Sequence, residues 1–139
     1  MRAFPAGCHS SKMTPKRPFE FTGRIRSFKY AIRGIILTLK SQHNAWIHAV
    51  ATIAVLIAGF ALHITRIEWC LIIVACAAVW TAESLNTAFE FLADATIKES
   101  NPMIGRAKDV AAGAVLITAI ASVAIGILVF GPYLIVLAK

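Results

Sequence analysis

The sequence predicts an all-α membrane protein in which an amphipathic surface helix precedes three transmembrane helices. Hydrophobic residues make up 58% of the 139 residues and charged residues only 15%, whereas soluble domains average about 45–50% and about 25%. The apolar residues are gathered in three long runs, and the basic residues cluster before the first of them. These observations argue against a water-soluble domain and indicate a lipid bilayer as the solvent.

The net charge of +7 belongs to the N-terminal segment. Nine of the fourteen Lys and Arg residues lie in the first forty positions, where Glu20 is the only acid. Such an excess suits either nucleic acid or the anionic face of a membrane. Because it directly precedes an apolar run, we expect the anionic membrane surface as a partner and no nucleic acid.

The part of the chain before the first apolar run divides into a tail and a helix. Residues 1–22 contain three prolines and no apolar stretch of the length that a secretory signal requires, so we expect a disordered, basic, cytoplasmic tail. Residues 23–139 then form the membrane domain. Within 24–40, apolar residues recur at steps of three and four with basic residues between them, which predicts a helix lying in the headgroup plane.

Three apolar segments are long enough to cross the bilayer, for which about 20 helical residues are needed. The predicted spans are 45–62, 69–94 and 110–138, joined by a short turn and by a polar connection over 95–109. Most loop cations lie in the N-terminal segment and in that connection, which predicts a cytoplasmic N-terminus. The expected location is therefore a membrane that the chain crosses several times.

The second predicted span carries a stripe of polar side chains. At about 100° per residue, Glu83, Glu90 and Asp94 fall on one helix face, and Asn86 flanks it. Acids at membrane depth are costly and usually mark function. The alternative interpretation is that they lie beyond the membrane on a solvated helix end.

Crowded carboxylates need a cation or shared protons, and Mg²⁺ prefers carboxylate, water and phosphate oxygens. Lys108 and Asp109, at the start of the third span, can meet phosphate from the same side. The pattern therefore indicates phosphoryl transfer, although the chain contains neither a P-loop nor the kinase Gly-rich loop. The histidines, including His48, share no metal-binding spacing and are interpreted as solvated or interfacial.

The segment ESLNTAFEFLAD (83–94), followed by RAKD (106–109), resembles the small integral-membrane diacylglycerol kinases and undecaprenol kinases of bacteria. The resemblance covers about residues 23–139. It implies three spans per chain, a surface helix, and a homotrimer with active sites between subunits. It also implies ATP as the phosphoryl donor, Mg²⁺ as the cofactor and a membrane lipid alcohol as the acceptor.

Transferred residue by residue, the resemblance implies a role for each polar side chain. Glu83 would be the general base for the lipid hydroxyl, and Glu90 would bind Mg²⁺ together with the nucleotide phosphates. The other implied roles are positioning for Asn86 and Asp94, and nucleotide binding for Lys108, Asp109 and Tyr30.

One position departs from the family pattern. Gln42 stands where the family usually has a glutamate that helps to bind the metal. A glutamine oxygen can still ligate Mg²⁺ but supplies no charge, so Gln42 is predicted to be a weaker metal ligand.

The sequence thus predicts a lipid kinase that converts diacylglycerol to phosphatidate. Undecaprenol kinase is an alternative, because the Ala-Ala-Gly sequence after Asp109 resembles that branch somewhat more. A non-catalytic, degenerate membrane protein is the alternative of another class, motivated by Gln42.

Overall fold

The computed structural model describes residues 21–96 and 101–139. The predicted tail lies outside these residues, except for its last two positions, which begin the first helix. The described residues form four helices: α1 (Phe21–Ser41), α2 (His43–Ala61), α3 (Arg66–Thr96) and α4 (Pro102–Leu137).

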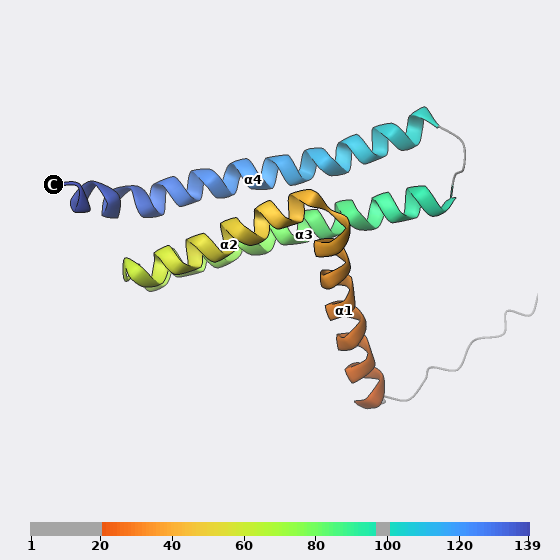
Figure 1. Cartoon of the computed structure of the whole chain (residues 1–139), viewed down its shortest axis with the longest axis horizontal. Helices are drawn as coiled ribbons and strands as arrows, with labels where there is room; N and C mark the ends of the chain where they lie inside the picture. Colours follow the sequence, from red (N-terminus) through yellow and green to blue (C-terminus); the bar gives the residue numbers. More distant parts are fainter. Residues whose placement is uncertain (1–20, 97–100) are drawn as a thin grey trace, which may run out of the picture.

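The helices are arranged as three neighbouring rods and one arm. Helices α2, α3 and α4 run roughly alongside one another, with α3 antiparallel to the other two, and α1 leaves them at a steep angle (Figure 1). The corner between α1 and α2 is Gln42, whose backbone is extended at φ −113° and ψ 123°. By length and composition, α2, α3 and α4 can each cross a membrane, which confirms the three predicted spans.

The start of α4 differs most from the prediction. The helix begins at Pro102 rather than at residue 110, so most of the predicted polar connection 95–109 is helical. Asn101 caps the helix, since its side chain accepts a hydrogen bond from the backbone nitrogen of Met103 at 2.9 Å. Proline in the first turn loses no helical hydrogen bond there. The polar composition of 102–109 therefore belongs to a polar helix end and not to a loop.

Helices α3 and α4 are joined at three levels along their length. At one end, the Tyr133 hydroxyl donates to Glu68 at 2.8 Å. Near the middle, the Ser122 hydroxyl donates to the carbonyl oxygen of Ala75 at 3.3 Å. At the other end, Lys108 and Asp94 form an ion pair at 2.6 Å. These contacts set the register of the antiparallel pair.

The buried core is small and lies toward the α2–α3 turn. It consists of Ile64, Ile72 and Val129, with partly buried neighbours such as Trp69. Most large apolar side chains are exposed, including those on the outer side of α4 such as Leu128. Exposed apolar surface on all three spans is expected where lipid is the solvent, because lipid tails are as apolar as the side chains themselves.

Candidate active site

Polar side chains are buried where the corner between α1 and α2 meets α3. They are Thr38 on α1 and Glu83, Asn86 and Thr87 on α3. Glu83 is only 1% exposed, and it is the largest fully buried side chain of the described residues. Burial of a carboxyl group at membrane depth is unfavourable by about 2.5–3.5 kcal/mol on insertion scales, and such acids are typically functional.

Glu83 opens onto a cavity of about 240 Å³. Within the described part of the chain, its Oε1 atom has no hydrogen-bond partner, and the same is true of Oδ1 of Asn86. The cavity is lined by residues of α2, α3 and α4: Asn44, Ile47, His48, Glu83, Asn86, Ala112, Val115, Leu116 and Ala119. An unpaired buried carboxylate oxygen beside a cavity is well placed to accept a proton from a group that enters it.

Glu90 is held by two neutral amides. Nδ2 of Asn86 donates to Oε1 of Glu90 at 3.0 Å, and Nε2 of Gln42 donates to Oε2. Gln42 reaches Glu90 because it occupies the corner between α1 and α2, which packs against α3. The carboxylate is therefore oriented on both sides, and the structure presents Gln42 to Glu90 as a hydrogen-bond donor.

A second polar group lies at the end of α3. Asp94 pairs with Lys108, and their side chains are 69% and 35% exposed. Asp109 is exposed on the neighbouring position of α4. Tyr30 is 61% exposed on α1, about 18 Å along the helix axis from the corner at Gln42 at 1.5 Å per residue.

The predicted site residues therefore separate into groups within one chain. Gln42, Asn86 and Glu90 are joined by hydrogen bonds, and Asp94 is joined to Lys108. The three acids follow one stripe of α3, but Glu90 is held by Gln42 and Asn86 whereas Asp94 pairs with Lys108 of α4. Among the described residues, no three His, Cys, Asp or Glu side chains are close enough together to hold a metal ion.

The oxygen atoms around Glu90 nevertheless fit Mg²⁺. The Glu90 carboxylate and the amide oxygen of Gln42 are hard ligands of the kind that Mg²⁺ takes. In nucleotide enzymes Mg²⁺ is usually bound through one or two carboxylates, with substrate phosphates and water completing the octahedron. A sparse protein ligand set is thus what a metal delivered with a nucleotide requires.

His48 and Asn44 line the cavity beside Glu83, and neither was predicted as a site residue. The sequence carries a signal for them, because they are four residues apart and so lie on one face of α2. Because they are far from Glu83 along the chain, the sequence pattern did not indicate that they lie beside it. Only the packing of α2 against α3 brings His48 and Glu83 to the same cavity.

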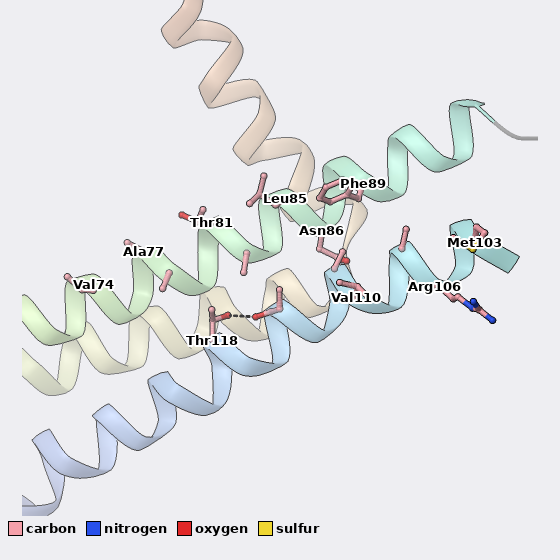
Figure 2. A pocket seen from close by; sticks show the side chains of 15 residues that line it. Val74, Ala77, Thr81, Leu85, Asn86, Phe89, Met103, Arg106, Val110 and Thr118 are labelled. Atoms are coloured by element: carbon pink, nitrogen blue, oxygen red, sulfur yellow. Dashed lines mark hydrogen bonds between the residues drawn. The ribbon is translucent and has the colours of Figure 1, made fainter. Parts of the chain in front are cut away.

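A larger, apolar groove runs between α3 and α4, with a volume of about 980 Å³. Figure 2 shows Thr81, Leu85 and Phe89 along the α3 side, with Val110 and Arg106 along the α4 side. Asn86 lines both this groove and the Glu83 cavity. The polar site is therefore flanked by a surface able to accept hydrocarbon.

Comparison with known proteins places the chain in a family. The family model for prokaryotic diacylglycerol kinase matches residues 29–130. The chain is 41% identical over 109 residues to an undecaprenol kinase of Bacillus subtilis, covering 78% of this chain and 89% of that protein. It is 39% identical over 101 residues to a diacylglycerol kinase of Synechocystis sp., covering 72% of this chain and 58% of that protein.

The matched segment contains the corner at Gln42, the acids of α3 and the RAKD sequence of α4. The hydrogen-bonded groups and the Glu83 cavity thus lie within the shared region. The chain belongs to the prokaryotic diacylglycerol kinase family and is a lipid kinase.

Proposed function

We propose that the chain transfers the γ-phosphoryl group of ATP to the hydroxyl group of a membrane lipid, with Mg²⁺ as cofactor. The observation that carries this proposal is Glu83, a residue 1% exposed that lines a cavity and has an unpartnered carboxyl oxygen. Phosphoryl transfer demands little covalent chemistry from a protein: positioning, charge neutralisation and a base suffice. The described residues offer candidates for all three.

In this proposal Glu83 accepts the proton of the lipid hydroxyl group as the hydroxyl oxygen attacks the γ-phosphorus. Glu90, oriented by Asn86 and Gln42, would hold Mg²⁺, which when bound neutralises charge on the phosphates. Lys108 and Asp109 of α4 would contact the nucleotide near the Asp94 end of the stripe, and Asp94 would position Lys108. Tyr30 of α1 would provide a further nucleotide contact.

The spacing along α3 suits a nucleotide lying beside the helix. Glu83 and Glu90 are about 10 Å apart along the axis, and Glu83 and Asp94 about 16 Å, at 1.5 Å per residue. The proposed base thus lies at the lipid end of the site and Lys108 at the nucleotide end. This order supports a phosphoryl group passing from the headgroup side toward the membrane interior.

Diacylglycerol is the substrate that the sequence predicts, with phosphatidate as the product. Undecaprenol is the second candidate, because the relative matched over 89% of its own length is named an undecaprenol kinase. The two candidates are distinguished by incubating the purified protein with labelled ATP and each lipid in turn, and measuring the label transferred to the lipid. A clear preference for the C55 alcohol would overturn diacylglycerol as the substrate.

The proposed setting is the bacterial plasma membrane, with the N-terminus in the cytoplasm and α1 on the anionic membrane surface. The basic residues of α1, including Arg26, Lys29 and Arg33, support that surface position. A homotrimer is proposed as the assembly. In one chain the proposed nucleotide-binding residues lie apart from Glu83, and a neighbouring subunit would supply them.

Glu83→Gln tests the base directly. The substitution keeps the shape of the side chain but removes its ability to accept a proton, so turnover should fall below detection while the protein still inserts and assembles. Glu68→Gln, on the same helix but at its opposite end, is the matched control and should retain activity. Detectable lipid phosphorylation by Glu83→Gln would refute the assignment.

A further inference from the structure

The Glu83 cavity has a second titratable side chain that the proposed mechanism does not use. His48 of α2 lines the cavity with Glu83 of α3, and the side facing them is formed by small and aliphatic residues of α4. Among the residues that line the cavity, Glu83 and His48 are the two with titratable side chains.

Two hydrogen bonds fix the position of the His48 backbone relative to α3. Nε1 of Trp80 donates to the Thr52 hydroxyl at 3.1 Å, and that hydroxyl donates to the carbonyl oxygen of His48 at 2.7 Å. Trp80 precedes Glu83 by nearly one turn of α3. The hydrogen bonds therefore hold the backbone of His48 against the same stretch of α3 that carries Glu83.

Glu83 needs an exit for the proton that it takes. Its side chain is 1% exposed, so bulk water does not reach it directly. Two of the residues that line the cavity carry unpartnered acceptors, Oε1 of Glu83 and Oδ1 of Asn86. Its volume of about 240 Å³ has room for ordered water, which needs 2–4 polar partners to be stable inside a protein.

The cavity also has a polar way out. His48 is half-buried, and Asn44, one turn earlier on α2, is exposed. Both line the cavity. A proton on the His48 imidazole is therefore one helical turn from a polar side chain at the surface, in the first turns of the span.

We propose that His48 is a proton-relay residue for Glu83. The inference rests on the proposed function of Glu83 as the base. The lipid hydroxyl gives its proton to the Glu83 carboxylate as its oxygen bonds to phosphorus and the bond to ADP breaks. The Glu83 carboxyl group then passes that proton through water in the cavity to the neutral imidazole, which releases it past Asn44. The carboxylate and the imidazole are both regenerated.

The kinetic test compares His48→Ala and His48→Gln with the wild type, using the full chain in lipid. We expect kcat to fall about 100-fold in both variants, the lower range for proton transfer by a side chain, with little change in KM for ATP or lipid. Imidazole added to His48→Ala should restore turnover in a concentration-dependent manner. His43→Ala, an exposed histidine on the same helix, is the control and should behave as the wild type.

A second measurement does not depend on turnover. In protein labelled with ¹⁵N-histidine, Glu83→Gln should move the ring nitrogen signals of His48 and leave those of His43 in place. Unmoved His48 signals would overturn the relay. Near-normal kcat in both His48 variants would also overturn it. The same holds if kcat falls in His48→Ala but not in His48→Gln, and added imidazole does not restore the activity of His48→Ala. If the wild type shows no kinase activity, the proposed function fails, and the NMR comparison still decides whether the two side chains are coupled.

Discussion

At the scale of single residues, Gln42 determines how one oxygen of the Glu90 carboxylate is held. The structure turns its amide nitrogen toward Glu90, while Asn86 donates to the other carboxylate oxygen. A glutamate at position 42 would place two carboxylates together, which is unfavourable without a cation. Glutamine instead orients Glu90 without needing a metal.

Gln42→Glu should therefore raise the affinity of the site for the metal. We expect the Mg²⁺ concentration for half-maximal activity to fall about tenfold, equivalent to ~1.4 kcal/mol, because the new carboxylate adds a charged ligand. Titration of Mn²⁺ binding by electron paramagnetic resonance measures the same gain without turnover. Gln42→Ala, which removes the amide and adds no charge, should weaken binding. Equal metal affinity in all three proteins would show that position 42 does not contact the ion.

At the scale of helices, the hairpin of α2 and α3 depends on a close approach at its turn. Gly59 of α2 is buried, and a Cβ atom there would lie 2.9 Å from the ring of Trp69 and 3.1 Å from Ile64. The ring of Trp69 also packs against Phe60, with centroids 4.7 Å apart. The absent side chain at Gly59 lets the first turn of α3 pack against the end of α2.

Gly59→Ala is expected to destabilise the protein by about 1–3 kcal/mol, the usual penalty for overpacking. The rigid ring of Trp69 can relieve this contact only by moving as a whole, whereas the end of a flexible side chain could simply rotate away. Gly34→Ala is the matched control: nothing lies within 4 Å of a Cβ atom there, and alanine favours the helix by about 1 kcal/mol. Unfolding in detergent followed by circular dichroism should give opposite signs for the two variants.

At the scale of the whole molecule, one chain places the proposed base and the proposed nucleotide-binding residues on the same pair of helices but not close together. Glu83 faces the cavity between α2, α3 and α4, whereas Lys108 pairs with Asp94 near the ends of α3 and α4. A site assembled between neighbouring subunits would bring Glu83 of one subunit near Lys108 of another.

Mixing subunits tests this assembly. Glu83→Gln and Lys108→Ala should each be inactive alone, the first for lack of a base and the second for lack of a phosphate contact. If sites are shared, mixed oligomers contain some sites with both residues intact, and activity should partly return when the variants are expressed together. A mixture as inactive as its components would indicate sites contained within single subunits.

Much of the fold could be predicted from the sequence because it depends on local hydrophobicity. The spans follow from uncharged runs of sufficient length, and the predicted starts of the first two are within about three residues of α2 and α3. The third helix starts eight residues before the predicted span, because residues 102–109 are polar and such polarity is also typical of a connection. A helix end emerging from the membrane is polar too, and its Asn101 cap was the local signal that distinguished the two.

The stripe of acids could likewise be read from the sequence, since the angle between residues of one helix is set by its 3.6-residue turn. What the sequence by itself determined is therefore what one helix determines: the spans, the shared face of Glu83, Glu90 and Asp94, and the family motif. Only the tertiary structure decided that Gln42 donates to Glu90 and that His48 shares a cavity with Glu83. Those contacts join residues on different helices, so they depend on how the α1–α2 corner and α2 pack against α3, which no local pattern encodes.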